Sequence, residues 1–327
     1  MTPAEIVAQF PKLRALVVGD VCLDRWCRYD PGLAEPSRET GIPRVAVVET
    51  DVTPGAAGTV ANNLVALQAG RVAVLGMVGE DGFGYELDRA LAARGISAKL
   101  LVRAPGVPTF TYTKLINCRT GVEDLPRVDF VYARPVPPEI EREIVARLER
   151  AAAEYDVILV SDQAETETGG VVTPAVRGAL ARMAAARPEM VIWVDSRLRP
   201  EHFRGVIVKP NQEEAEAACR RVLGRVAYAE LRCRTGAKLL VITRGREGAV
   251  IVNESGVQHV PGRPIENPVD ICGAGDSFSA GAALALQITG DPQTAVRFGN
   301  LVASITIMKP GTGTASPGEV ISNSSAR

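Results

Sequence analysis

The chain has 327 residues, 46% of them hydrophobic, and its 37 Lys and Arg residues almost balance 38 Asp and Glu residues. This balance excludes the strong positive field expected of a protein that binds nucleic acid or an anionic membrane. The apolar stretches are of strand length, well short of the roughly 20 residues that a membrane helix needs, and the first residues do not resemble a signal peptide. We therefore expect a cytoplasmic protein with a small-molecule partner and no nucleic-acid or membrane partner.

Short apolar runs alternate with helical patterns along most of the chain. The first run, residues 13–19, ends in Gly and Asp, which is typical of a buried strand that stops at the carboxyl edge of a sheet. The other predicted strands are residues 71–78, 157–160, 191–194, 205–208 and 238–242, and the predicted helices are residues 60–68, 84–94, 139–153, 173–186 and 212–222. This alternation predicts one α/β domain over residues 1–327, with a parallel sheet covered by helices on both faces.

Two segments, about residues 29–50 and 107–131, interrupt this alternation. Their β-branched and aromatic stretches lack intervening helices, so we expect antiparallel strands in a small separate sheet. Such a sheet could form a lid that excludes water from a reaction, or an edge extension that covers apolar surface. Its exposed face could also pair two copies of the chain into a homodimer, although charges can block an exposed edge. We expect the tail after Thr312 to be frayed.

The sequence DICGAGDSFSAG at residues 270–281 precedes an Ala- and Leu-rich helical stretch. Gly273, Ala274 and Gly275 have little or no side chain, so their N–H groups can approach a phosphate at the positive end of the following helix. Asp276 could then act as a general base towards an alcohol beside the transferring phosphoryl group. The alternative is that this stretch is a loop whose Asp only caps the helix, because such a loop can have the same sequence. We expect Cys272 to be a small buried hydrophobe rather than a redox switch.

Residues 270–281 resemble the C-terminal signature of the ribokinase (pfkB) carbohydrate-kinase family. Five stretches before this signature also resemble family motifs and occur in the family's order: GDVCLD at 19–24, PGAAGTVANN at 54–63, GEDGFG at 79–84, KPNQEE at 209–214 and TRGREG at 243–248. The resemblance implies a ribokinase-like three-layer α/β/α sandwich with a mostly parallel central sheet and a small β-sheet lid. It also implies an enzyme that phosphorylates a sugar hydroxyl with ATP, with Asp276 as the base.

The resemblance also assigns residues to the two substrates. It implies that Asp24, Gly55 and Thr59 hold the sugar. The residues around MgATP would be Asn211, Glu214, Thr243, Gly245 and Asn300. Glu214 would organise Mg²⁺ through water, and a potassium ion would lie near Asp270 and the loop 309–312.

Several stretches are similar to the bacterial heptose-7-phosphate kinases within this family: residues 19–25, 39–48, 108–114, 125–130, 161–162 and 209–214. A sugar phosphate would need cations near the lid, and Arg38, Lys114 and Arg127 are candidates, although such residues are often solvated surface charges. The chain departs from the family at Ala56 and Thr59, where a Gly and an Asn are usual. It also lacks the basic and Gly residues expected at 163–167. A kinase for an unphosphorylated ketose, aldose or sugar acid, and a non-catalytic sugar or nucleotide sensor, therefore stay open.

Two other nucleotide-binding classes fit poorly. No G-x-G-x-x-G follows the first strand, which argues against a dinucleotide-dependent oxidoreductase. No G-x-x-x-x-G-K-[ST] occurs, which argues against a P-loop kinase.

Overall fold

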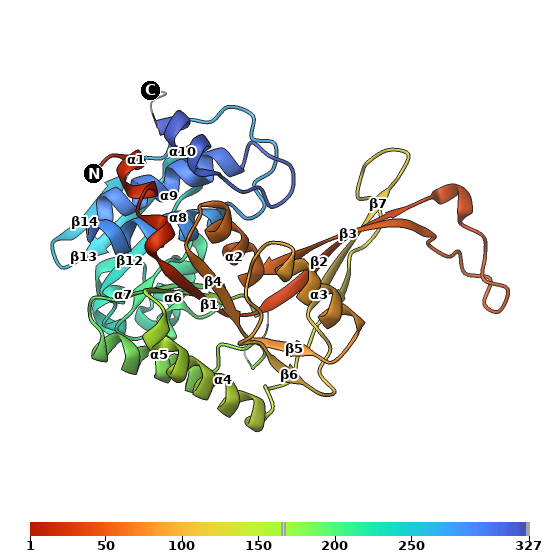
Figure 1. Ribbon diagram of the computed structural model, residues 1–327, viewed down its shortest axis with the longest axis horizontal. Coiled ribbons are helices and arrows are strands. Elements are labelled where there is room, and N and C mark those ends of the chain that lie inside the picture. The colour runs from red at the N-terminus through yellow and green to blue at the C-terminus, as the bar shows by residue number, and fades with distance from the viewer. Residues whose placement is uncertain (165, 167, 325–327) are drawn as a thin grey trace.

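The computed structural model describes every residue except 165, 167 and 325–327. Its main sheet has eight strands in the order β14-β13-β12-β11-β10-β9-β1-β4 (Figure 1). The strands from β12 to β4 run parallel, whereas β13 and β14 are antiparallel. The strands are β1 (Arg14–Gly19), β4 (Arg71–Leu75), β9 (Val157–Asp162), β10 (Val191–Ser196), β11 (Ile207–Val208), β12 (Leu239–Thr243), β13 (Ala249–Asn253) and β14 (Gly256–Val260).

Both faces of this sheet are buried. In β1, Ala15 and Val17 belong to one apolar core, while Leu16 and Val18 belong to the other, because successive side chains of a strand point to opposite faces. The first core is covered by α1 (Pro3–Val7), α2 (Ala57–Ala66), α3 (Gly82–Ala92), α8 (Ala274–Thr289), α9 (Pro292–Thr306) and α10 (Pro317–Ser324). The second is covered by α4 (Pro138–Ala151), α5 (Pro174–Ala186), α6 (Gln212–Leu223) and α7 (Tyr228–Thr235). The predicted three-layer sandwich is thus confirmed.

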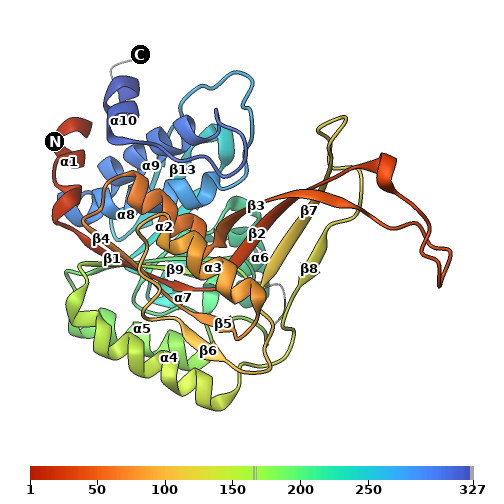
Figure 2. The same cartoon turned by 45° about the vertical axis from the view of Figure 1, so that its right-hand side comes forward.

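The predicted lid is a four-stranded sheet in the order β3-β2-β7-β8. Its strands are β2 (Val21–Tyr29), β3 (Val47–Ala56), β7 (Thr111–Asn117) and β8 (Val128–Phe130). It differs from the expectation in two ways. It begins at Val21, because β2 follows β1 after the single residue Asp20, and β2 pairs with β7 in parallel rather than antiparallel. Residues 30–46, between β2 and β3, extend away from the body as an arm (Figures 1 and 2).

The expectation of a frayed tail is wrong for the residues up to 324. They form α10, where the Val320 side chain is fully buried and Ser316 accepts a hydrogen bond from the N–H of Glu319. Lys309 forms an ion pair of 2.7 Å with Glu319. Polar composition alone suggested fraying, but one buried Val and a capped first turn hold this segment in place.

The predicted strand at 71–78 is divided. Gly76 separates β4 from β5 (Met77–Gly79), and β5 pairs with β6 (Val102–Ala104) in a separate two-stranded sheet. A β carbon at Gly76 would lie 2.4 Å from the carbonyl oxygen of Gly19, so only glycine permits this close crossing. Within the described residues, no helix is long and apolar enough to cross a membrane.

Candidate active site

The N-terminus of α8 carries the motif predicted to stabilise phosphoryl charge. Gly273 is its N-cap residue, with a left-handed backbone (φ 75°) that favours glycine. The N–H of Ala274 donates to the carbonyl of Ile271, whereas the N–H groups of Gly275 and Asp276 have no acceptor among the described residues. Free N–H groups in the first turn of a helix form a natural site for an anion. The local geometry therefore suits the predicted role, although the N–H of Ala274 is already engaged.

Asp276 lies in the first turn of α8, and its side chain is half-buried. Burial, followed by the carboxylate of Asp195, raises the pKa of Asp276 to about 7, and Lys209 acts in the opposite direction. A carboxyl group with a pKa near neutrality is well suited to general base catalysis at physiological pH. The arrangement can therefore take a proton from a substrate hydroxyl.

A buried ion pair supports this helix start. The ammonium group of Lys209, which follows β11, lies 2.6 Å from the carboxylate of Asp195 in β10. Burial lowers the pKa of Lys209, but the carboxylates of Asp195, Glu214 and Asp276 outweigh that effect and raise it. A β carbon added at Gly275 would lie 3.3 Å from Nζ of Lys209, so the cation lies beside the first turn of α8. Neither residue was predicted from the sequence to belong to the site, although Asp195 directly follows the predicted strand 191–194 and Lys209 opens a family motif.

On the lid side, Asp24 in β2 faces the same region. Burial raises its pKa to about 6, while the thiol of Cys22 and the cations Lys114 and Arg127 lower it. The carboxylate lies directly over Gly55, where a β carbon would be 2.4 Å from the carboxyl carbon of Asp24. Asp24 raises the pKa of Asp276, and both carboxylates raise the pKa of Cys272. The structure thus brings the predicted sugar-binding and catalytic carboxylates to one place.

The three predicted phosphate-binding cations are placed differently. Lys114 lies 3.6 Å from Glu123. Arg127 donates to Asp129 and stacks over the ring of Tyr112, the residue that pairs with Asp24 across the lid sheet. Arg38, in contrast, is exposed on the arm that extends from the body, so the structure does not gather it with the other two.

The turn at the start of α2, predicted to bind the sugar, carries the two departures from the family. Thr59 is buried, and its hydroxyl donates to the carbonyl of Pro54 at 3.4 Å, while its methyl group faces Gly273. Ala56 has φ 51° and ψ −116°, a backbone conformation that residues with a β carbon rarely adopt. The chain therefore keeps the backbone of a glycine at Ala56 despite the extra methyl group.

A small pocket of about 90 Å³ lies between the lid and the loop that follows β9. Asp20 lines it and accepts hydrogen bonds from the N–H groups of Gln163 and Val171, which anchors this loop. Aromatic side chains of the lid side also line it: Phe110, Tyr112 and Tyr132. The altered stretch 163–167 belongs to this loop, but residues 165 and 167 lie outside the described part of the chain. Sequence analysis did not single out these aromatic residues.

The predicted nucleotide-binding residues meet at the ends of β11 and β12. Asn211 and Glu214 form a capping box at the start of α6, with the N–H of Asn211 donating to the Glu214 carboxylate at 2.7 Å. Asn211 also forms an isolated parallel bridge with Thr243. Gly245, two residues after Thr243, is exposed and has a left-handed backbone (φ 54°), and no atom lies within 4 Å of the position of an added β carbon. Burial and the Asp195 carboxylate raise the pKa of Glu214.

Two further predicted residues hold loops near this region. The amide of Asn300 in α9 donates to the carbonyl of Pro261. Asp270 accepts from the N–H of Cys272 at 2.9 Å and from the N–H of Gly311 at 3.0 Å, so it joins the two loops expected around a potassium ion. The expectation that Cys272 is buried is wrong: it is exposed, because it precedes the helix that buries Ser277 and the residues after it.

The sequence model of the pfkB family carbohydrate kinases matches residues 14–318. The chain belongs to the pfkB family of carbohydrate kinases. The predicted family is thereby confirmed, and with it the enzyme class at the level of the family.

Comparisons with individual proteins agree with this membership. The bifunctional protein HldE of Geobacter metallireducens is 33% identical over 320 residues, covering 94% of this chain and 62% of the relative. HldE of Geobacter sulfurreducens is 34% identical over 321 residues, with the same coverage. These matches support the heptose-kinase branch that the motifs resembled. The chain spans about 62% of the length of these curated relatives.

Solved structures of low sequence identity confirm the fold. Ribokinase from Thermotoga maritima superposes with a TM-score of 0.69 at 20% identity, covering 95% of this chain and 99% of that one. Arabidopsis thaliana ribokinase complexed with ribose and ATP gives 0.70 at 17% identity, covering 96% and 99%. The ribokinase-like architecture is therefore shared over nearly the whole chain.

Proposed function

We propose that this pfkB-family chain transfers the γ-phosphoryl group of ATP to a hydroxyl of a sugar, with Asp276 as the general base. One observation carries the proposal: the half-buried carboxyl group of Asp276, the free N–H groups of Gly275 and Asp276, and the buried ammonium of Lys209 meet at the start of α8. Phosphoryl transfer needs in-line positioning and compensation of charge on the transferred group. These groups supply a base and compensating positive charge within one turn of helix.

The hydroxyl proton would pass to the carboxylate of Asp276 as the oxygen attacks the γ-phosphorus, and the bond from the γ-phosphorus to the bridging oxygen would break to release ADP. The N–H groups of Gly275 and Asp276 and the ammonium of Lys209 would then face the negative charge on the phosphoryl oxygens. On the acceptor side, Asp24 accepts hydrogen bonds from sugar hydroxyls, held over Gly55. Among the described residues, the groups that fit these roles converge from α8, β2 and the end of β11.

Magnesium and ATP belong to the proposal. The capping box occupies one oxygen of the Glu214 carboxylate, and the other oxygen is left to hold a magnesium-bound water. Mg²⁺ usually keeps several waters and binds through one or two carboxylates and the substrate phosphates, so Glu214 and Asn211 fit it. When bound, the ion would neutralise charge on the β- and γ-phosphates. Thr243, Gly245 and Asn300 would lie around the nucleotide.

Within the sugar kinases, we favour a sugar phosphate of the heptose-7-phosphate type as the acceptor. Lys114 and Arg127 support this choice, since both act on the pKa of Asp24 from the lid and can bind a phosphate. Similarity to HldE also supports it. Arg38 could contribute only if the arm moved, or from a second copy in a lid-mediated homodimer. That dimer, a cytoplasmic location and a potassium ion near Asp270 remain proposals.

The acceptor class is tested by incubating the chain with MgATP and a panel of heptose 7-phosphate, unphosphorylated heptoses and hexoses, and sugar acids. Phosphorus-31 NMR of the products identifies the new phosphate ester. We expect a sugar bisphosphate as the product from the sugar phosphate. Lys114→Gln should raise the KM for the sugar phosphate more than the KM for a neutral sugar. Exclusive turnover of unphosphorylated sugars would reject the sugar-phosphate assignment but keep the kinase.

A further inference from the structure

A second pocket lies on the α5 side of the main sheet, away from the lid, and no role described above uses it. It has a volume of about 320 Å³ and is open to solvent. It is bounded by the first turns of α5 and by the 3₁₀ turn Pro200–His202 with the residues that follow it. The residues that line it are Pro174, Arg177, Gly178, Ala181, His202 and Arg204. No carboxylate is among them.

Arg177 is the half-buried cation of this pocket. Its guanidinium donates one hydrogen bond, to the carbonyl of Val172 at 2.8 Å, and lies over the ring of Phe203. Burial and the neighbouring cation Arg199 lower its pKa. It forms no ion pair with any residue that the structure describes. Burying a charge costs free energy unless an opposite charge compensates it, so a bound anion would offset the cost of burying the Arg177 guanidinium.

The carboxylates that face Arg177 are already engaged by other cations. Asp162 accepts two hydrogen bonds from Arg199, at 2.7 and 3.0 Å. Glu201 accepts two from Arg221, at 2.5 and 2.9 Å. Both acids raise the pKa of Arg177 from a distance, but neither forms an ion pair with it, and the described residues that line the pocket include cations and no carboxylate.

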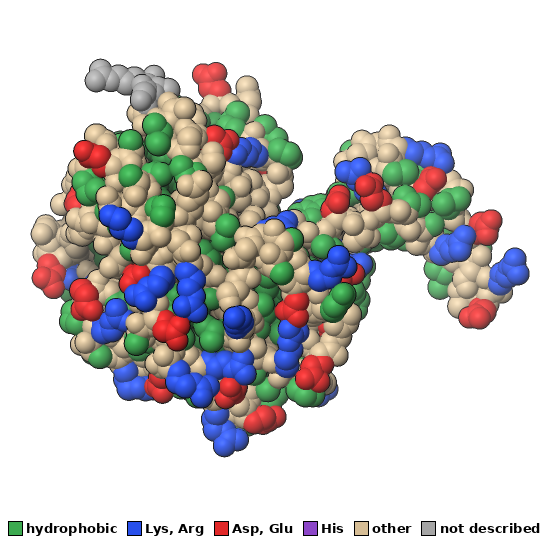
Figure 3. Space-filling view, viewed as in Figure 1, with side chains coloured by type: hydrophobic (Ala, Val, Ile, Leu, Met, Phe, Trp, Pro, Cys, Tyr) green, Lys and Arg blue, Asp and Glu red, His purple; other side chains and the backbone are tan. Residues whose placement is uncertain are grey.

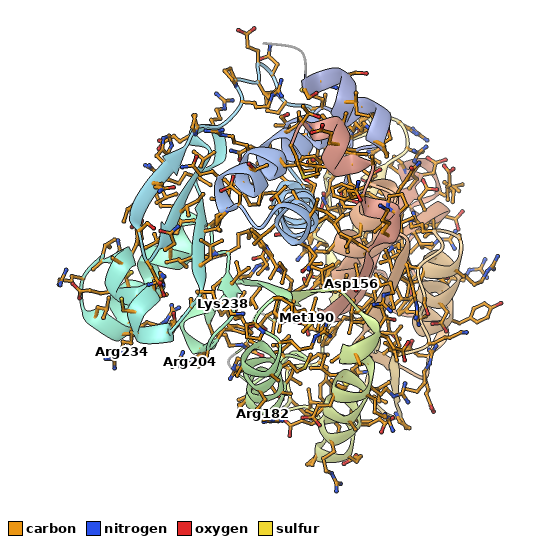
Figure 4. The ribbon with its side chains drawn as sticks, turned by 60° about the vertical axis from the view of Figure 1, so that its left-hand side comes forward. Asp156, Arg182, Met190, Arg204, Arg234 and Lys238 are labelled. Atoms are coloured by element: carbon orange, nitrogen blue, oxygen red, sulfur yellow. The ribbon has the colours of Figure 1, made fainter. Side chains whose placement is uncertain are left out.

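Arg204, which follows the 3₁₀ turn, adds a second arginine to the lining of the pocket. Its NH1 group donates to the carbonyls of Glu201 and Phe203, which fix its position, and within the described chain it has no ion-pair partner. His202 is exposed beside it. Figure 4 shows Arg204 along the lower margin of the molecule, between Arg234 and Arg182. Lys and Arg side chains also gather over the lower part of the face in Figure 3, where α4 and α5 lie.

We infer that this pocket, hereafter the Arg177 pocket, binds a phosphate group, either free inorganic phosphate or the phosphate of a small phosphorylated metabolite. Two arginines that line one pocket, each held by backbone carbonyls, can bind a phosphate with paired hydrogen bonds. The inference does not rest on the proposed kinase activity, since it concerns binding alone.

The pocket is also connected to the substrate side through the loop after β9. The carbonyl of Val172 holds Arg177, and the N–H of Val171 donates to Asp20 at 2.7 Å. Asp20 in turn lines the small pocket beside the lid. An anion bound to Arg177 would therefore lie next to the segment 171–172, where the loop is held by the hydrogen bond to Asp20.

The test is isothermal titration calorimetry of the full chain with inorganic phosphate, at constant ionic strength. A saturating, non-hydrolysable ATP analogue with Mg²⁺ keeps the start of α8 occupied. We expect one binding site, weakened at least tenfold in Arg177→Gln and in Arg204→Gln. Arg204 is exposed, so its variant tests the site even if Arg177→Gln folds poorly. Arg234→Gln is the matched control, because Arg234 is an exposed arginine without an ion pair in the described chain, and it should bind like the wild type.

A parallel titration with glucose 6-phosphate distinguishes the two sources of the phosphate group. If glucose 6-phosphate binds more tightly than inorganic phosphate and Arg204→Gln abolishes that binding, the pocket is assigned to a phosphorylated metabolite. Binding of inorganic phosphate alone, with the same loss, assigns it to the free ion. No measurable binding to the wild type, or binding that both arginine variants leave unchanged, would overturn the inference.

Discussion

The carboxylate of Asp24 lies directly over the α carbon of Gly55, so close that a β carbon there would be 2.4 Å from the carboxyl carbon. The two residues stand on neighbouring antiparallel strands, β2 and β3, where Asp24 pairs with Thr53 and Cys22 pairs with Gly55. Glycine at this position therefore serves the placement of the acceptor-binding carboxylate rather than a turn. This relationship leads to a first prediction.

Gly55→Ala should displace the Asp24 side chain and leave the fold intact, because a carboxylate can rotate away from the added methyl group. Losing a hydrogen bond to a charged group costs about 1.5–3 kcal/mol, which corresponds to a rise of roughly 10- to 100-fold in KM for the acceptor. Steady-state kinetics measure the change, with KM for ATP expected to stay constant. Gly82→Ala is the control, since no atom lies within 4 Å of the added β carbon there. Equal KM values in both variants would contradict the prediction.

Ala56→Gly should stabilise the protein. Ala56 has φ 51°, and such strain costs about 1–3 kcal/mol, which outweighs the backbone entropy lost by introducing glycine. We expect a gain of about 1 kcal/mol, measured by chemical denaturation. Ala57→Gly, one residue later in the first turn of α2, is the matched control and should destabilise the protein, because it removes a buried methyl group from an ordinary helical backbone. Loss of stability in both variants would show that Ala56 is not strained.

The buried pair Lys209–Asp195 should show strong coupling in a double-mutant cycle. Lys209→Met leaves the Asp195 carboxylate buried without a partner and should destabilise the fold by about 3–5 kcal/mol. Replacing both residues, as Lys209→Met with Asp195→Leu, should restore most of that stability, because no buried charge is left. Turnover should stay low in the double variant, since the ammonium beside α8 is missing. Recovery of turnover with stability would remove Lys209 from the account of phosphoryl transfer.

The pKa of Asp276 gives a prediction about pH and stability. Its folded-state value of about 7 lies above the ordinary 3.8, so the folded protein binds this proton more tightly than the unfolded chain. Ionised Asp276 therefore destabilises the fold above pH 7, and the penalty fades as the pH falls from 7 towards 3.8. Asp276→Asn should melt at a higher temperature than the wild type at pH 8 and at nearly the same temperature at pH 4. The opposite order at pH 8 would contradict the raised pKa.

The sequence predicted the features that depend on neighbouring residues. The alternation of strands and helices gave the three-layer sandwich, and residues 270–281 gave the turn and first helical residues around Asp276. Asn211 and Glu214 were also singled out, as nucleotide-binding residues, but the capping box that they form three residues apart was not predicted. In each of these cases the chemistry and the geometry lie within one turn of the chain.

Features that depend on contacts between distant segments were missed. Lys209 and Asp195 meet only because β10 and β11 are neighbours in the sheet. The change from the main sheet to the lid is hard to see in the sequence, since β2 begins with the apolar residues 21–23 and a single residue separates it from β1. Arg38 resembled a phosphate ligand by residue type, but the sequence does not show that its segment extends from the body.

The central claim is that Asp276 removes the proton from a sugar hydroxyl during transfer from MgATP. The most direct measurement is acceptor-dependent ADP release by the wild type and by Asp276→Asn, with nucleotide binding measured in parallel. We predict that the variant binds MgATP normally and that its kcat falls by about 10² to 10⁴, the range for a lost general base. The wild-type rate should also fall as the pH drops below about 7, because protonated Asp276 cannot accept the proton. Unchanged acceptor-dependent turnover in Asp276→Asn would contradict the account.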